Sequence, residues 1–326
     1  MKQILKRKLI YFVKVTLGLT LVTWILFLVD HEIFLEYFAQ LTFGTILLIG
    51  FLSLLSLYIQ YLRWKYLLNC NSDHFAKEDV IPSFLAGFTF RLMLPGGHAE
   101  ISKIFLLPGK KKGKVAAFGL EKLVLTFIKL FLILIVLPLT FPQLTPYCVA
   151  LLIVLMITIL LIPKLRILKR FQEKETNYYT MLSFTLVFSL ITFALMAGQY
   201  YILLNKVNAI SLWPTAHTSI YLWGSGMIPI SISGLGVREG LAVFFFNSYG
   251  INAAQAVATS LFLFALGSII PALAGVYFIS KKKEHFKELK DVVSSTRDLI
   301  KASRFRKQIM VSTHKISDQI ATNHTD

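Results

Sequence analysis

Three glutamates stand inside long apolar stretches of this 326-residue chain: Glu100, Glu121 and Glu239. A charged side chain at the centre of a bilayer costs about 3 kcal/mol, so such groups usually face a cavity, pair with an opposite charge or serve transport. Each glutamate has candidate partners close by in the sequence: Arg91, Lys103, Lys122 and Arg238. The spacing therefore predicts ion pairs, or a charged cavity, at membrane depth. The alternative is that the glutamates only neutralise basic neighbours so that helices can pack.

Proline and glycine interrupt the apolar sequence just before Glu100 and just before Glu239. The stretch 81–107 is broken at Pro95, and the stretch 213–247 is broken from Pro229 to Gly236. A break of this kind ends one half-helix and leaves free amides at the start of the next, where anions are attracted. The second break also offers serine hydroxyls as donors. We therefore expect two re-entrant broken-helix hairpins that form a positive pocket for the anionic head of an amphiphile.

Lys122 and Lys129 are seven residues apart and so share one stripe of a helix. Lys129 would lie roughly 20 Å from the cytoplasmic end, at about 1.5 Å per residue, so it must line a cavity or meet a carboxylate. The predicted substrate-binding residues are Arg91, Pro95, Gly96, Gly97, Glu100, Lys103, Glu121, Lys122, Lys129, Pro229, Ser231, Ser233, Gly234, Gly236, Arg238 and Glu239.

Other polar residues carry simpler interpretations. His98 and His217 are expected to be hydrogen-bonded core groups, and the basic run 110–114 is expected to anchor the chain at anionic headgroups. Two cysteines, Cys70 and Cys148, cannot form a zinc site alone. We expect no metal and no cofactor.

The elements that must position these residues are membrane helices. Hydrophobic residues make up 56% of the chain and the mean hydropathy is +0.66, which excludes a soluble enzyme, a secreted disulfide scaffold and a disordered chain. Runs long enough to span about 30 Å of hydrocarbon cover residues 9–29, 43–62, 115–138, 147–162, 181–204 and 254–279. The predicted fold is an all-α integral membrane protein with six full transmembrane helices and two re-entrant hairpins.

The 34 basic residues against 17 acidic ones set the expected orientation. With the N-terminus inside, most basic residues gather in cytoplasmic stretches, including eight from Arg63 to Lys114 when Lys103 is counted and Arg91 is assigned to the apolar segment. Lys206 alone falls in an external connection. Both termini are therefore expected in the cytoplasm, with the protein in the cell membrane.

The spans divide into a first half, 1–140, and a second half, 147–280, followed by a basic cytoplasmic tail, 281–326. Three spans per half imply opposite orientations, which is the inverted repeat common in secondary transporters. Superposing Glu100 on Glu239 also brings Glu121 onto Ser260.

At these residues the chain resembles the flippase-like family typified by the transmembrane region of lysylphosphatidylglycerol synthase, the multiple peptide resistance factor. The resemblance rests on LPGGHAEISK, AAFGLEKL, PISISGLGVREG and INAAQAVATSL, and it covers about residues 63–279. It implies an inverted-repeat membrane protein that moves lipids or lipid-linked molecules between leaflets. It places functional weight on Glu100, Lys103, Glu121, Lys122, Gly234, Gly236, Arg238 and Glu239.

The chain departs from the family pattern in the first half. Ala99 stands where the family usually has glycine, Lys103 where it has arginine, and Leu125 where it tends to have aspartate. The last departure weakens a first-half acidic network. The tail after the last predicted span is too short for an aminoacyl-transferase domain, so we expect that this chain does not make lysyl-lipid itself.

Three functions compete on these observations. The first is a flippase or scramblase for an anionic or zwitterionic lipid, such as a phospholipid or a polyprenyl phosphate. The second is a non-catalytic scaffold of envelope lipid synthesis. The third is an acyltransferase, since residues 74–79 match a His-x4-Asp pattern in which the carboxylate orients a general-base histidine. The expected partners are membrane lipids and not nucleic acid, and assembly with further copies of the chain stays open.

Overall fold

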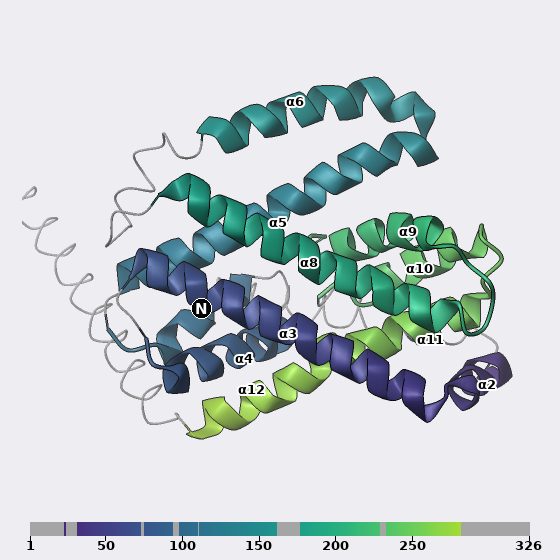
Figure 1. Ribbon diagram of the computed structural model, residues 1–326, viewed down its shortest axis with the longest axis horizontal. Coiled ribbons are helices and arrows are strands. Elements are labelled where there is room, and N and C mark those ends of the chain that lie inside the picture. The colour runs from purple at the N-terminus through teal and green to yellow at the C-terminus, as the bar shows by residue number, and fades with distance from the viewer. Residues whose placement is uncertain are drawn as a thin grey trace, which may run out of the picture. The chain divides into compact units, whose positions relative to one another are not determined.

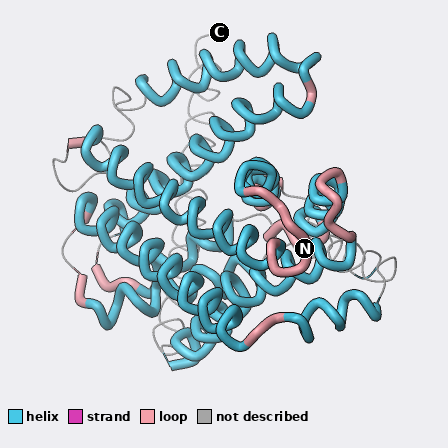
Figure 2. The backbone as a smooth tube through the Cα atoms, turned by 45° about the vertical axis from the view of Figure 1, so that its right-hand side comes forward, coloured by secondary structure: helices cyan, strands magenta, loops and turns pink. Residues whose placement is uncertain are grey.

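The computed structural model describes residue 23 and residues 31–72, 75–93, 98–109, 111–161, 177–228 and 233–281. The chain divides into two compact units, 1–278 and 279–326, and almost every described residue belongs to the first. Every regular element in these ranges is a helix (Figure 2). The all-α prediction is therefore confirmed for the described residues.

The helices of the first half follow one another with short connections (Figure 1). They are α2 (His31–Gln40), α3 (Phe43–Asn71), α4 (Lys77–Met93), the 3-10 helix η1 (His98–Leu106) and α5 (Lys111–Thr140). Thr42 starts α3 because its hydroxyl accepts the Thr45 amide at 3.3 Å, which satisfies one of the free amides at a helix start. A 3-10 turn, η2 (Pro142–Leu144), then leads to α6 (Thr145–Leu161).

The second half repeats this order of long, shorter, short and long helices. It consists of α8 (Tyr178–Leu204), α9 (Leu212–Ser225), α10 (Val237–Asn247), α11 (Ala253–Phe264), the π-helical segment η4 (Ala265–Ile269) and α12 (Ile270–Lys281). Asn177 caps α8 and Asn252 caps α11 through their side-chain oxygens. That the two halves are inverted copies stays a prediction.

Within the part of the chain that the structure describes, five helical segments are long and apolar enough to cross a membrane. They cover Phe43–Asn71, Lys112–Thr140, Pro142–Ile159, Tyr178–Leu204 and Ala253–Lys281. These correspond to five of the six predicted spans, and the remaining one, 9–29, lies outside the described residues apart from residue 23. Their outer faces carry exposed apolar side chains, such as Phe51 on α3 and Leu151 on α6, as expected for a surface that meets lipid. The protein is an integral membrane protein.

The helix breaks fall where the sequence predicted them. The chain leaves α4 at Met93 and enters η1 at His98, and it leaves α9 at Ser225 and enters α10 at Val237. Pro95, Gly96, Gly97, Pro229 and Ser231 lie outside the described residues. The short element after the first break is a 3-10 helix, which differs from the α-helical half-helix expected there. That these paired elements are re-entrant hairpins also stays a prediction.

The described residues form two large hydrophobic cores, and each contains residues of both halves. Around the first break, Trp64 and Leu68 of α3 pack with Phe84 and Phe88 of α4 and with Ile104 of η1. In the second half, residues of α8, α10 and α11 form a separate cluster that α2 also joins. The long helices α3 and α8 pack side by side between these cores (Figure 1). Helix α5 contacts both of them, and its residue Glu121 is buried among the packed helices.

Candidate functional site

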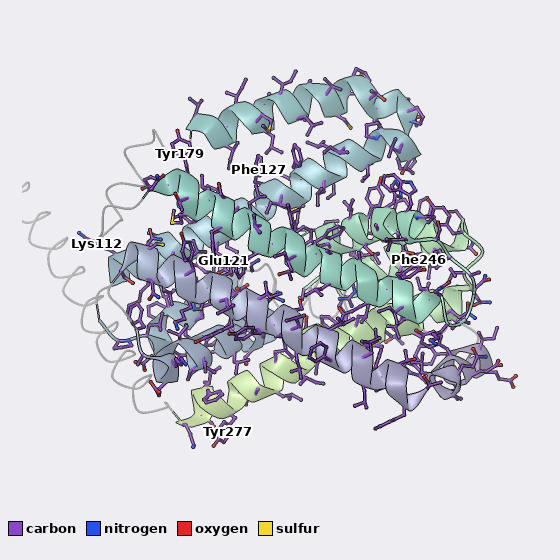
Figure 3. The ribbon with its side chains drawn as sticks, in the orientation of Figure 1. Lys112, Glu121, Phe127, Tyr179, Phe246 and Tyr277 are labelled. Atoms are coloured by element: carbon purple, nitrogen blue, oxygen red, sulfur yellow. The ribbon has the colours of Figure 1, made fainter. Side chains whose placement is uncertain are left out.

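Lys103 is the centre of a buried charge cluster in the first half. Its ammonium donates to Glu100 Oε1 at 3.2 Å and to Glu121 Oε2 at 2.6 Å, and its side chain is only 2% exposed. The same ammonium lies 3.7 Å from the centre of the Trp64 ring, within cation–π range. Glu121 sits among the packed helices, whereas Lys112 of the same helix lies at its exposed start (Figure 3). The short element η1 is thereby tied to the long helix α5.

Further cations surround the two carboxylates. Glu100 Oε2 pairs with Lys122 at 2.5 Å and with Arg91 Nε at 3.5 Å. Burial raises the pKa of Glu100, but Lys122, Arg91 and Lys103 together outweigh it and hold that pKa well below its usual range. Because these cations lower its pKa, this carboxylate stays ionised through the neutral range.

Arg63 is a member of the cluster that the sequence analysis missed. It was counted among the cytoplasmic basic residues, but α3 continues through it and its side chain is buried. It pairs with Glu121 at 3.3 Å and donates through Nη1 to Ser189 of α8 at 3.0 Å. The signal was present in the sequence, since an arginine followed by tryptophan ends an apolar run. However, counting basic residues in loops to orient the chain assigns such an arginine to a loop.

Two lysines, Lys122 and Lys114, have different partners from those expected from the sequence. Lys122 was paired with its neighbour Glu121, but its ion pair is with Glu100. Consecutive residues of an α-helix point about 100° apart, so adjacent side chains of α5 meet different groups. Lys114 was expected to anchor headgroups, yet it is 2% exposed and donates to the carbonyl oxygens of Leu107 and Gly109 at 2.6 and 2.8 Å. It caps the chain beyond η1 instead.

The second cluster surrounds Glu239, whose side chain is fully buried. Glu239 Oε1 pairs with Arg238 and accepts the Ser260 hydroxyl at 3.0 Å, while Arg238 Nε also donates to Ser260 at 2.9 Å. Glu239 Oε2 accepts the amide of Gly236 at 2.6 Å. The start of α10 is thus capped by the chain's own carboxylate, which corrects the expectation that this terminus is free to attract an anion.

The two clusters use matching sequence positions. Superposing Glu100 on Glu239 in the sequence places Glu121 on Ser260. In the structure Lys103 bridges Glu100 and Glu121, and Arg238 bridges Glu239 and Ser260. Each half therefore joins its short middle helix to its next long helix through one basic side chain.

A cavity of about 470 Å³ opens beside the first cluster. Its charged lining consists of five basic and two acidic side chains: Arg63, Arg91, Lys103, Lys122, Lys129, Glu100 and Glu121. The second half contributes Trp223, Gly226 and Ser233 to the same wall. The lining carries a formal excess of three positive charges, so the cavity favours anions.

A second cavity of about 210 Å³ adjoins the first and reaches Arg238. Both cavities are lined by Arg91, Lys129, Trp223, Gly226 and Ser233. These shared residues come from α4, α5, α9 and the turn before α10, so the two charge clusters lie along adjoining spaces. The expectation that Lys129 lines a cavity is met: its ammonium lies 5.1 Å from the centre of the Trp223 ring.

The turn that leads into α10 has an unusual backbone. Ser233, Gly234 and Gly236 all have positive φ values, of 55°, 82° and 84°. Glycine adopts such angles at little cost, but serine does not. A side chain at Gly234 would also meet Ser225 Oγ at 3.0 Å. Of these three predicted site residues, Ser233 lines both cavities.

The structure tests the expected hydrogen bonding of His217 but not that of His98. His217 Nε2 lies 3.2 Å from Thr140 Oγ1 and its ring packs edge-on against Tyr221, which confirms a hydrogen-bonded core group. The side chain of His98, and all of His74 from the acyltransferase pattern, lie outside the described residues. The aromatic faces beneath the cations were not predicted, because no sequence spacing brings Trp64 to Lys103 or Trp223 to Lys129.

Comparison with known proteins gives one family. The family described as "Lysylphosphatidylglycerol synthase TM region" matches residues 12–275, which include every residue of both clusters and both cavities. No curated protein and no solved structure matches the chain.

Proposed function

The chain belongs to the family of the lysylphosphatidylglycerol synthase transmembrane region, and from this membership and the charged cavity we propose that it moves a lipid between the two leaflets of the cell membrane. The cargo is a phospholipid or a polyprenyl-phosphate lipid, and the protein acts as a transporter, not as an enzyme. The lipid-related role follows from the family, and the movement itself is the proposal.

The observation that carries the proposal is a positively charged cavity inside a bundle with apolar outer faces. Buried charges are expensive in a membrane protein and usually mark a substrate pathway. Burying an unpaired cation costs several kcal/mol, which a bound anion would offset. A phosphate is the anionic group that every phospholipid and polyprenyl phosphate presents.

The dimensions favour entry of the head group alone. A volume of about 470 Å³ lies in the range of small-molecule sites and suits a lipid head, while the acyl chains would remain along the apolar outer faces of the helices. The adjoining 210 Å³ space would take the head onward to Arg238. Alternating access around paired broken helices, with both termini in the cytoplasm, would then expose the head to one leaflet and then to the other.

Arg238→Ala tests the proposal in vesicles that contain the purified protein and a tail-labelled fluorescent phospholipid, with external dithionite to bleach the outer leaflet. Lipid movement should fall to the protein-free rate, because Arg238 faces the second cavity and pairs with the cap of α10. Lys206→Ala, at an exposed position between α8 and α9, is the control and should keep the wild-type rate. Wild-type protein that moves no lipid faster than empty vesicles would refute the proposal.

Glu239→Gln separates transport from a scaffold role. The single carbonyl oxygen of a glutamine can still accept the Gly236 amide, and its NH2 group can donate to the Ser260 hydroxyl, so α10 should remain capped, but the ion pair with Arg238 is lost. A transporter should then fold and lose lipid movement. Full movement by this well-folded variant would contradict a role for the second cluster.

A further inference from the structure

We infer that the cavity selects lipids whose head group is a net anion and excludes head groups that carry an ammonium, with Lys129 as the side chain that holds the phosphate. This inference rests on the proposed transport function and narrows its substrate class. It depends on how the charges of the cavity are already partnered.

The carboxylates of the cavity are saturated by the protein's own cations. Glu100 is contacted by Lys103, Lys122 and Arg91. Glu121 is contacted by Lys103 and Arg63. An ammonium head group would need a carboxylate or a comparable acceptor once it left water. Neither glutamate that lines the larger cavity has an oxygen without a cation beside it.

Three of the four aromatic rings that line the larger cavity already have a cation over them, and the fourth, Phe84, packs edge-on against Tyr61 and Phe88. Aromatic rings bind quaternary and primary ammonium groups through cation–π contacts, and such rings line the larger cavity. Arg91 lies 4.6 Å from the centre of the Phe88 ring, and Lys122 lies 5.5 Å from that of Phe118. Lys129 covers Trp223. A choline or ethanolamine head would have to displace one of these cations.

The basic side chains of the cavity, by contrast, can still bind a further anion. Arg91 and Lys122 share one oxygen of Glu100, and their side chains remain 31% and 36% exposed. Within the described ranges, no carboxylate lies within 4.0 Å of the Lys129 ammonium. An ammonium without a counter-ion in a cavity of net positive charge is the strongest place for an anion.

Lys129 also stands where a moving head group must pass. It lines both cavities together with Trp223 and Ser233. Gly226 lies beside it: a Cβ at this position would be in ordinary van der Waals contact with the Lys129 ammonium, at 3.9 Å. A phosphate that moves from the first cluster towards Arg238 would therefore contact Lys129 on the way. Lys122, on the same stripe of α5, lines only the larger cavity.

The test is head-group selectivity in vesicles with tail-labelled lipids and dithionite. The probes are phosphatidylglycerol, a net anion; phosphatidylcholine, a zwitterion; lysyl-phosphatidylglycerol, a net cation; and a polyprenyl phosphate. We expect the wild type to move at least one of the two anionic probes about tenfold faster than the other two lipids, the difference that one charged hydrogen bond gives. If only one of the two anionic probes moves, that result identifies the substrate as a glycerophospholipid or as a polyprenyl phosphate.

Variants of Lys129 complete the test. Lys129→Gln should lower the rate of the anionic lipid about tenfold and remove the preference, Lys129→Arg should keep both, and Lys206→Gln should change neither. Equal rates for phosphatidylcholine or lysyl-phosphatidylglycerol in the wild type, or an unchanged preference in Lys129→Gln, would overturn the inference while leaving lipid transport intact. Failure of all four probes to move would instead refute the proposed function, and the selectivity with it.

Discussion

Replacing Lys103 with methionine should destabilise the first half more than any other single change of charge there. Methionine keeps the unbranched stem that packs against Trp64, so the change removes mainly the ammonium. Glu121 loses its 2.6 Å partner and Glu100 its 3.2 Å partner, both at nearly complete burial. Removing one member of a buried ion pair costs about 3–5 kcal/mol. At about 2 °C per kcal/mol for a unit of this size, the melting temperature should fall by about 6–10 °C.

Lys122→Met is the matched control for this prediction. Lys122 also pairs with Glu100, but its side chain is 36% exposed and Glu100 keeps Lys103 and Arg91. A pair exposed to this extent contributes about 1 kcal/mol or less, so melting should change by about 2 °C or less. Both variants can be measured by the thermal loss of the monodisperse peak of detergent-purified protein. Equal shifts for the two variants would refute the idea that Lys103 is the structural centre of the cluster.

Two further changes probe the contacts around this cluster. Gly275→Ala should lower stability by about 1–3 kcal/mol, because a Cβ on α12 would collide with the Leu85 carbonyl oxygen of α4. Gly119→Ala, which has open space around it, should leave stability unchanged, and the melting temperatures of the two variants test this. Acid should also weaken the cluster: since the pKa of Glu100 lies well below its usual 4.5, its stabilisation is complete above pH 4.5 and is lost as the pH falls through the lowered value. Glu100→Gln should flatten this part of the melting temperature against pH, and an unchanged acid slope would contradict it.

The sequence was sufficient for the helices and for the places where they break. Long apolar runs and the prolines and glycines between them depend on local chemistry, and five predicted spans correspond to membrane-length helices. The pair Arg238 and Glu239 was also predictable, because the partners are adjacent and α10 begins directly before them.

Partnership between distant residues was not predictable in the same way. Arg63 meets Glu121 across 58 positions, and only the packing of α3 against α5 brings them together. The count of loop charges that orients a membrane protein assigns Arg63 to water, so it obscured this contact. Likewise, whether a helix terminus is free or capped by a nearby glutamate depends on a side-chain rotamer, which the residues before α10 do not determine.

The environment of Lys129 was predictable only in part. Its depth on α5 and its spacing from Lys122 predicted a cavity or a carboxylate partner, but the choice depended on Trp223 from the other half of the chain. Charge counts alone also did not distinguish anionic from zwitterionic cargo. That distinction follows from which glutamate oxygens and which aromatic faces are already occupied.

Native mass spectrometry of the protein released from gently solubilised membranes tests the central claim most directly, because it reports what occupies the cavity. We expect a retained lipid with an anionic phosphate head in the wild type and in Lys206→Gln, and its loss in Lys129→Gln. Retention of zwitterionic lipid by all three, or the same anionic lipid bound equally with and without the Lys129 ammonium, would contradict it.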